Sequence, residues 1–256
     1  MENALRGKNI LVFGATGRIG SSVCQVIANQ GAHVAVHCNR GLERAQVIAE
    51  SIKSAGGKAL VIQGDVTKKE EAVRCVQKAA EEMGEIHGAV NLIHRDKEFQ
   101  PTVIADMDWE DWEPHIDAMK AYFYIVKAVL PYMRRQKYGK IVYLSGGLSY
   151  RFLEGCAPFS AVKAGLNAFS KTLALEEGKN HITVNAVAPG KIVTQQKNLG
   201  SQWNQLEEQQ LKNNPLGRFA TPTDVANGIL TFLLPENDYM TGQTIYLAGG
   251  EIMPMP

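Results

Sequence analysis

The stretch Gly14-Ala15-Thr16-Gly17-Arg18-Ile19-Gly20 joins a short apolar run, Asn9–Phe13, to a segment with apolar residues at helical spacing, Gly20–Asn29. A glycine-rich turn between a strand and a helix lets the backbone approach a pyrophosphate, whose charge is stabilised at the helix N-terminus. A tight turn without a ligand could use the same glycines. Its place after the first strand and before the first helix favours a phosphate site. We therefore expect a phosphate at Gly14, Thr16, Gly17, Arg18, Ile19 and Gly20.

Short apolar runs alternate with helical segments along the whole chain. Strands are expected at 9–13, 33–37, 59–63, 88–93, 140–145, 182–187 and 243–247. Helices are expected at 20–29, 42–55, 68–83, 109–136, 157–178 and 222–234. The strands lack a polar alternation, which is typical of a parallel sheet buried on both faces. The pattern predicts an α/β fold of the Rossmann type: one doubly wound parallel sheet with helices on both faces, in a single domain over 1–256.

Length and composition exclude several classes of protein. The chain has 256 residues, 45% of them hydrophobic, and a formal net charge of +1, so no basic excess favours nucleic acid or an anionic membrane. Its apolar runs are too short to span a bilayer, and its start does not resemble a signal peptide. Four widely spaced cysteines indicate reduced thiols and no zinc site. We expect a cytoplasmic protein, with a mobile substrate lid at 195–218.

The end of the second expected strand bears on the choice of cofactor. Many dinucleotide-binding proteins place an acidic residue there, which binds the ribose 2′-hydroxyl of NAD. This chain has His37-Cys38-Asn39-Arg40 instead. Arg40 can meet a 2′-phosphate, and Arg18 can add a second cation, although both could also be solvated loop residues. The sequence therefore favours NADP over NAD, held in part by Asn39 and Arg40.

Residues 6–252 resemble the short-chain dehydrogenase/reductase family, in its branch of about 250 residues. Several motifs follow in the family's order: Asp65-Val66, Asn91, Pro189-Gly190-Lys191-Ile192-Val193-Thr194, Thr241-Gly242-Gln243 and Ala248-Gly249-Gly250. The resemblance implies that Asp65 and Val66 contact adenine, and that Asn91 lies at the cofactor. It also implies that Pro189, Gly190, Ile192 and Thr194 hold the nicotinamide carboxamide. In the glycine-rich turn, Gly17 and Arg18 are exchanged relative to the family.

The resemblance also implies where a carbonyl would react. The family uses a Tyr to protonate the developing alkoxide, a Ser to hold it, a Lys to bind the ribose, and an Asn to order a water. Aligned by spacing, the Lys is Lys163, but the Tyr, Ser and Asn positions hold Phe159, Gly146 and Met119. Loss of a positioned general acid typically costs ~10²–10⁴ in rate. The family's usual proton relay is therefore not expected, while Lys163 can still bind the cofactor.

Other side chains could replace the missing groups. Tyr150 follows the fifth strand, and His94 takes the last position of the family's Asn-Asn-Ala-Gly element. An imidazole titrating near neutral pH is a competent proton donor. Tyr150 could equally be a rim or interface aromatic, and His94 an ordinary loop histidine. We expect an apolar pocket for a small hydrophobic substrate, lined by Met119, Phe152, Leu153 and Phe159.

Three functions remain compatible with this pattern. The first is an NADP(H)-dependent oxidoreductase that acts on a hydrophobic carbonyl or alcohol through Lys163 and through His94 or Tyr150. The second is a catalytically silent, cofactor-binding scaffold or regulatory subunit. The third is a non-redox enzyme, a lyase or cyclase, on the same fold. The resemblance further implies a homodimer or homotetramer, assembled through the long helices at 109–136 and 157–178.

Overall fold

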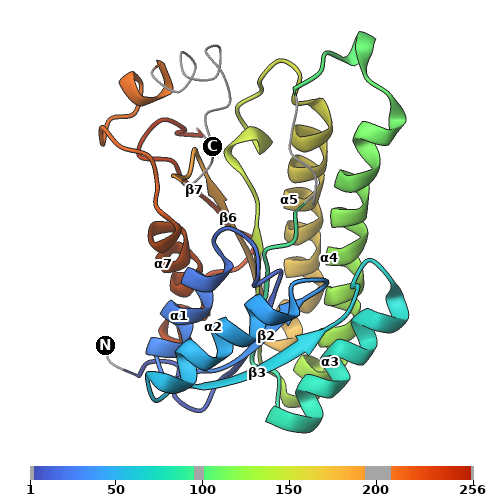
Figure 1. Ribbon diagram of the computed structural model, residues 1–256, viewed down its shortest axis with the longest axis vertical. Helices are drawn as coiled ribbons and strands as arrows, with labels where there is room; N and C mark the ends of the chain where they lie inside the picture. The colour runs from blue at the N-terminus through green and yellow to red at the C-terminus, as the bar shows by residue number, and fades with distance from the viewer. Residues whose placement is uncertain (1–2, 95–100, 194–208, 255–256) are drawn as a thin grey trace.

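A computed structural model describes residues 3–94, 101–193 and 209–254, and Figure 1 shows its course. In these residues seven parallel strands form one sheet in the order β3-β2-β1-β4-β5-β6-β7. The strands are β1 (Asn9–Phe13), β2 (His33–Cys38), β3 (Lys58–Gln63), β4 (Gly88–Asn91), β5 (Gly139–Leu144), β6 (Ile182–Pro189) and β7 (Thr244–Leu247). The order reverses between β1 and β4, as in a Rossmann-type sheet. The predicted fold class is confirmed.

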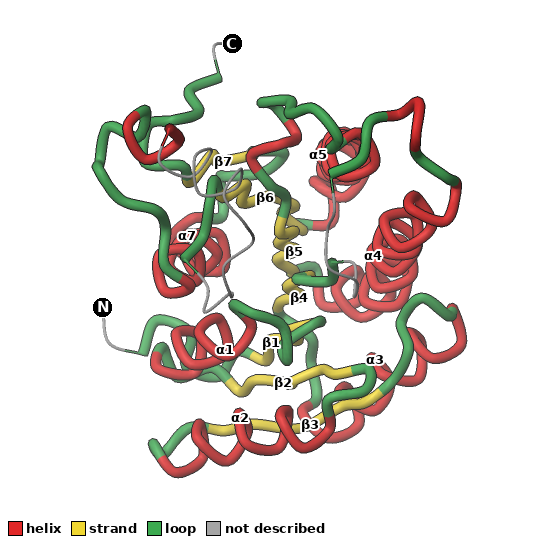
Figure 2. The backbone as a smooth tube through the Cα atoms, turned by 45° about the horizontal axis from the view of Figure 1, so that its top comes forward, coloured by secondary structure: helices red, strands yellow, loops and turns green. Residues whose placement is uncertain are grey.

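Helices cover both faces of the sheet (Figure 2). One layer contains α1 (Gly20–Asn29), α2 (Leu42–Ser54) and α7 (Pro222–Leu233), and the other contains α3 (Lys69–Met83), α4 (Trp109–Gln136) and α5 (Ala157–Glu177). Short 3₁₀ turns lie at Ile104–Asp106, Gly147–Ser149, Gly178–Asn180 and Pro235–Asn237. Each layer encloses its own apolar core against the sheet.

The alternation of side chains along β1 explains why both cores form. Ile10 and Val12 belong to the core beneath α1, α2 and α7, whereas Leu11 and Phe13 belong to the core beneath α3, α4 and α5. Full burial of one such side chain stabilises the fold by about 1.5–3 kcal/mol. A strand that contributes to two cores must therefore be apolar at consecutive positions, as the sequence of β1 is.

Local signals set the ends of several elements. Helix α7 begins with a capping box, in which Thr221 Oγ1 accepts from Asp224 N at 3.2 Å and Asp224 Oδ2 accepts from Thr221 N at 2.7 Å. Helix α3 ends at Gly84, whose φ of +87° suits glycine. Strand β4 stops at Asn91, two residues before the expected end, because Asn91 Oδ1 accepts the Ile93 N–H at 2.9 Å and turns the chain.

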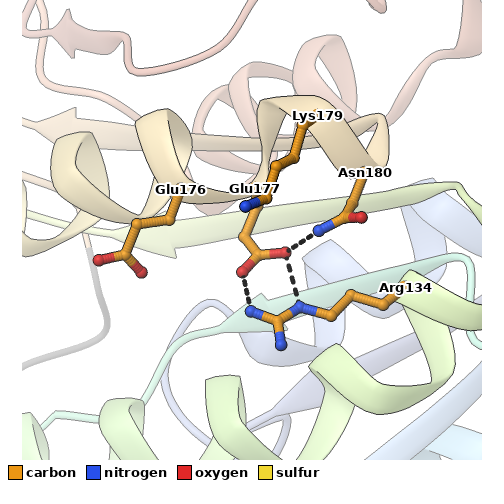
Figure 3. Close-up of a pocket in the computed structure, with 5 residues that line it drawn as sticks. All are labelled: Arg134, Glu176, Glu177, Lys179 and Asn180. Carbon is orange, nitrogen blue, oxygen red and sulfur yellow. Dashed lines mark hydrogen bonds and ion pairs between the residues drawn. The ribbon is translucent and has the colours of Figure 1, made fainter.

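An ion pair joins the ends of α4 and α5 that lie away from the carboxyl ends of the strands. Arg134 donates from two nitrogens to the fully buried carboxylate of Glu177, and Asn180 Nδ2 donates to Glu177 Oε2 at 3.0 Å (Figure 3). A small cavity of about 490 Å³ lies beside this cluster. Glu176 points away from the ion pair (Figure 3), so the cluster is a structural tie between the two helices.

Two further expectations concern the substrate lid and membrane-spanning helices. Most of the expected lid, residues 194–208, lies outside the described residues. Its end is anchored, because Asn214 Nδ2 donates to Ala248 O at 3.2 Å and Leu216 N donates to Gly249 O at 3.2 Å. Among the described residues, no helix is long and apolar enough to cross a membrane.

Candidate functional site at the switch point of the sheet

A cleft of about 1230 Å³ opens at the carboxyl ends of the strands, where the strand order reverses. We call it the switch-point cleft. Its walls come from the glycine-rich turn, the tip of β2, the segment after β3, the end of β4, the first turns of α4, the segment after β5, α5, and the segment after β6. Open α/β sheets bind ligands at this place, and the volume exceeds that of most single-ligand pockets, about 300–1,000 Å³.

The glycine-rich turn has the geometry of a backbone cradle. Gly14 has a φ of +76°, and a Cβ there would lie 3.2 Å from the backbone of Leu92 and Ile93. A Cβ on Gly20 would lie 2.0 Å from Ala15 O, so only glycine allows this turn to enter α1. No side chain caps α1, and its first N–H, that of Gly20, donates to Gly17 O at 3.3 Å, within the glycine-rich turn. Gly14, Thr16, Gly17, Arg18 and Ile19 line the cleft, and Gly20 does not.

Three arginines gather at the tip of β2. Arg18, Asn39 and Arg40 are exposed and line the cleft, as the sequence predicts. Arg44, in the first turn of α2, donates to Gly17 O at 3.4 Å, which links this helix to the glycine-rich turn. Arg44 was not predicted, although it follows Arg40 by only four residues, across the start of α2 at Leu42. The concentration of positive charge favours an anionic group at this corner.

His37 lies beneath the glycine-rich turn and was not predicted. Its Nδ1 accepts from Gly14 N at 3.3 Å, and its Nε2 lies 3.0 Å from Gly64 O, which fixes Nε2 as the protonated nitrogen. Burial lowers the pKa of His37 to about 4, so the ring is neutral at pH 7. His37 therefore positions the turn and adds no charge. A histidine inside an apolar strand gives no signal of this role.

The segment after β3 forms the wall next to this corner. Asp65 and Val66 line the cleft, as expected from the resemblance. Asp65 Oδ1 accepts from Thr67 Oγ1 at 2.7 Å and Thr67 N at 3.2 Å. Burial alone would raise the pKa of Asp65, but the bonds from Thr67 and the charge of Lys68 outweigh it and hold that pKa below its usual value. Asn91 is buried behind the cleft and does not line it.

The far end of the cleft adjoins β6. Pro189, Gly190 and Ile192 line it, and Thr194 lies outside the described residues. A Cβ on Gly190 would lie 3.1 Å from Ala248 Cβ, so the chain is closely packed there. Arg151 and the buried carboxylate of Glu251 form an ion pair that also lines the cleft. This pair joins the segment after β5 to the C-terminal segment.

Lys163 is a buried cation at the centre of the site. Its Nζ donates to Leu144 O at 2.7 Å and lies 4.7 Å from the centroid of the Tyr143 ring. Burial lowers its pKa to about 7, because no carboxylate compensates the loss of water. Ser145, next to Leu144, is also buried and lines the cleft, and its Oγ has no hydrogen-bond partner among the described residues. Both polar groups are thus directed to a ligand-sized space.

The Phe159 ring lies 5.8 Å from Lys163 Nζ, and two histidine rings lie next to it. The centroids of Phe159 and His94 are 5.2 Å apart, those of Phe159 and His115 are 6.0 Å apart, and those of the two histidines are 6.1 Å apart. His94 and Phe159 line the cleft, whereas His115 on α4 is buried behind them. Sequence analysis predicted His94 but not His115. The only sequence signal for His115 is a polar residue on the apolar face of a helix.

Three residues that were expected at the site lie elsewhere. Tyr150 is about half exposed and its ring packs against Tyr246, with the centroids 5.6 Å apart, so it is not a wall of the cleft. Met119 packs between α4 and α5, where its Cε lies 3.4 Å from the position of a Cβ on Gly165. The side chain of Phe152 is exposed, outside the cleft. The apolar lining comes instead from Leu148, Leu153, Phe159 and Ile252.

The strand order, the glycine-rich turn and the cleft at the switch point define a Rossmann-type α/β protein. Comparisons with known proteins make the assignment more specific. The family described as enoyl-(acyl carrier protein) reductase matches residues 14–251. The 3-oxoacyl-(acyl-carrier-protein) reductase FabG of Staphylococcus epidermidis is 34% identical over 247 residues, which cover 96% of this chain and 99% of that protein. The chain therefore belongs to the short-chain dehydrogenase/reductase family of oxidoreductases.

Solved structures agree with this assignment. A 3-oxoacyl-(acyl-carrier protein) reductase from Brucella melitensis with bound NAD has a TM-score of 0.85 and 26% identity, covering 97% of this chain and 92% of that one. A short-chain type dehydrogenase/reductase from Mycobacterium ulcerans has a TM-score of 0.89 at 23% identity, covering 96% and 90% of the two chains. The second likeness concerns the fold alone.

Proposed function

We propose that the chain is an NADP(H)-dependent oxidoreductase that interconverts a hydrophobic carbonyl compound and its alcohol at the switch-point cleft. The observation that carries this proposal is the buried Lys163 together with the buried Ser145 hydroxyl, which has no hydrogen-bond partner among the described residues, in the cleft that begins at the glycine-rich turn. Keeping both polar groups buried costs free energy unless a ligand satisfies them. The printed names of the relatives, which are reductases of 3-oxoacyl groups, support a ketone beside an apolar chain.

The residues of the cleft fit such a cofactor. The glycine-rich turn and the N-terminus of α1 would hold the pyrophosphate, and Arg18, Arg40 and Arg44 would bind a 2′-phosphate. Asp65 and Val66 would contact the adenine. Lys163, on α5, would donate from Nζ to ribose hydroxyls while it keeps its bond to Leu144 O. The absence of an acidic residue at the tip of β2 favours NADP over NAD.

When bound, the reduced nicotinamide supplies the hydride that adds to the carbonyl carbon. Addition leaves negative charge on the carbonyl oxygen, and a preorganised donor must stabilise it. Ser145 Oγ can donate to that oxygen, because it is buried, lines the cleft and lacks another partner among the described residues. Leu148, Leu153 and Ile252 exclude water from the reacting carbon and contact an apolar substrate.

A calorimetric titration with NADPH, with NADH as the comparison, tests the cofactor half of the proposal. We expect NADPH to bind more tightly than NADH. Loss of NADPH absorbance with long-chain aldehydes and ketones then tests the reaction. If neither cofactor binds, the proposed function is wrong.

One observation favours a second candidate, a catalytically silent, cofactor-binding subunit. Phe159 and Gly146 carry no group that donates a proton or holds an oxyanion through a side chain, although both line the cleft. A silent subunit would bind NADPH with the same preference but oxidise none of it with any carbonyl compound. A non-redox enzyme would instead convert its substrate without consuming NADPH. The same two measurements therefore separate the three functions.

We further propose that the chain forms a homodimer or homotetramer through α4 and α5. The outward face of α5 carries small or apolar exposed residues at helical spacing: Ala161, Gly165, Ala168, Thr172 and Leu175. Such a flat stripe lets a second helix approach closely. Light scattering after size exclusion is expected to give a dimer or larger species, and Ala168→Arg is expected to give monomers. A monomeric wild type would contradict this assembly.

A further inference from the structure

We propose that His94 donates the proton to the carbonyl oxygen, in the place of the hydroxyl that Phe159 lacks, and that His115 positions its ring. The inference rests on the proposed reductase function and identifies the general acid of that reaction. Neither the identity of the relatives nor the position of Lys163 assigns this role.

The first step of the argument is the position of His94. It follows the end of β4 at the switch point, lines the cleft, and remains accessible to solvent. Its ring meets the Phe159 ring edge to face, with 5.2 Å between the centroids and 77° between the planes. An imidazole in the cleft wall beside this ring is close to the place where a hydroxyl on the Phe159 ring would act.

The second step concerns His115. It lies on α4 and is 2% exposed, and its ring contacts both the His94 ring and the Phe159 ring. The three rings therefore hold one another at angles of 67° to 77°. His94 belongs to a loop, whereas His115 and Phe159 belong to long helices. Two rings on helices thus restrict the rotamers of the loop residue His94.

The third step balances the reaction. Hydride addition breaks the C=O π bond, and its electron pair goes to oxygen. An N–H group of the His94 imidazolium gives its proton to that oxygen, and the electron pair of the broken N–H bond stays on the neutral ring. The carbonyl is reduced to an alcohol, and the nicotinamide cofactor of the proposed function is oxidised. Water at the open side of His94 then restores the proton.

Lys163 is the alternative proton donor, and Lys163 and His94 differ in their access to solvent. Lys163 Nζ is buried and bonded to Leu144 O, and it would be further engaged by ribose hydroxyls. His94 has direct access to solvent protons. The charged groups that α4 and α5 contribute to the cleft wall are Glu110, Glu113 and Asp117 of α4 and Lys163 of α5.

The test uses His94→Gly, which leaves space for an added imidazole. His181→Gly is the matched control, because His181 is an exposed loop histidine with a φ of +56° that glycine adopts without strain. NADPH binding is measured first for all three proteins. We then expect His94→Gly to lower the single-turnover rate of NADPH oxidation with a long-chain ketone by ~10²–10⁴, and imidazole to restore part of it. The control keeps the wild-type rate and does not respond to imidazole.

A second readout does not depend on turnover. In protein labelled with ¹³C-histidine, the ring resonances of His94, assigned through the His94→Gly variant, are expected to shift when NADP⁺ is added. Those of His181 should stay unchanged. For the positioning role, His115→Gln is expected to keep more of kcat than His115→Leu, with KM unaffected in both.

The outcomes separate the two proposals. A wild type that oxidises no NADPH with the ketone contradicts the proposed reductase function and this proposal with it. An active wild type overturns the role of His94 alone if His94→Gly keeps its rate. The role of His94 is also contradicted if His94→Gly loses its rate, still binds NADPH, and is not restored by imidazole. Unchanged His94 resonances with bound NADP⁺ also contradict the proposal.

Discussion

The ring of Phe159 occupies the space that a side chain at Gly146 would need. A Cβ on Gly146 would lie 3.1 Å from Phe159 Cε1 and 3.2 Å from Cζ. The backbone of Gly146 is extended, with a φ of −168°, so its conformation suits any residue. The two residues therefore lie in close contact. The effect of a substitution at one of them is expected to depend on which residue stands at the other.

This contact predicts a specific cost for Gly146→Ala. Overpacking a closely packed site typically costs about 1–3 kcal/mol, and we expect a loss of this size in the free energy of unfolding. Phe159→Leu in the same chain should remove most of the loss, which a double-mutant cycle of urea unfolding measures. Gly178→Ala is the control, because a Cβ there meets no atom within 4 Å. Additive effects at Gly146 and Phe159 would contradict the contact.

Phe159→Tyr is expected to create a second proton donor. The new hydroxyl would be attached at Cζ, beside Gly146, on a ring that lines the cleft. We expect the rate of ketone reduction to rise by up to ~10²–10⁴, and to stay high when His94→Gly is added. Phe169→Tyr, a substitution of the same type further along α5, serves as the control. An unchanged rate in Phe159→Tyr would show that the hydroxyl does not reach the substrate.

Arg40→Ala is expected to reduce the preference for NADPH. A hydrogen bond to a charged group contributes about 1.5–3 kcal/mol, so the Kd of NADPH should rise about 10- to 100-fold. The Kd of NADH should change little, because NADH lacks the 2′-phosphate. Calorimetric titration gives both values, and Arg135→Ala, at the far end of α4, is the control. An equal loss for both cofactors would mean that Arg40 acts on the turn and not on the phosphate.

Lys163 makes the stability of the free protein depend on pH. Its pKa in the folded protein is about 7, against about 10.4 for an unfolded lysine. Between these values the unfolded chain binds more protons, so the contribution of Lys163 to the free energy of unfolding rises with pH. Lys163→Met removes this rise, which amounts to at most about 1.4 kcal/mol per pH unit. Urea unfolding at pH 7 and pH 9 measures it, and Lys171→Met on the same helix should keep the wild-type dependence.

The sequence predicts the fold well because its signals are local. Consecutive apolar residues, as in β1, mark strands that contribute to two cores, and glycine at 84 marks a helix end. The bounds of α1 and α4 agree with those expected. Strand β4 is shorter than expected because a side-chain hydrogen bond of Asn91 turns the chain, and hydropathy carries no information on that bond.

The candidate site is predicted less completely, because it depends on contacts between distant segments. The glycine-rich turn follows from its place between a strand and a helix, and Lys163 follows from the resemblance to the family. His115 does not, since its proximity to His94 arises from the packing of α4 beside the end of β4. Tyr150 was expected near the cleft, but the 3₁₀ turn Gly147–Ser149 precedes it and its ring lies against Tyr246. The number of residues between the fifth strand and Tyr150 does not predict a turn of this kind.

The ion pair between Arg134 and Glu177 has a mechanical consequence. Helix α4 has 28 residues, which at 1.5 Å per residue makes a rod of about 42 Å. It is tied to α5 near one end, and its other end forms a wall of the cleft. A rotation of about 1° around the tied end displaces the cleft end by about 0.7 Å for a rod of this length. A rotation of α4 about this tie would therefore change the width of the cleft at its other end.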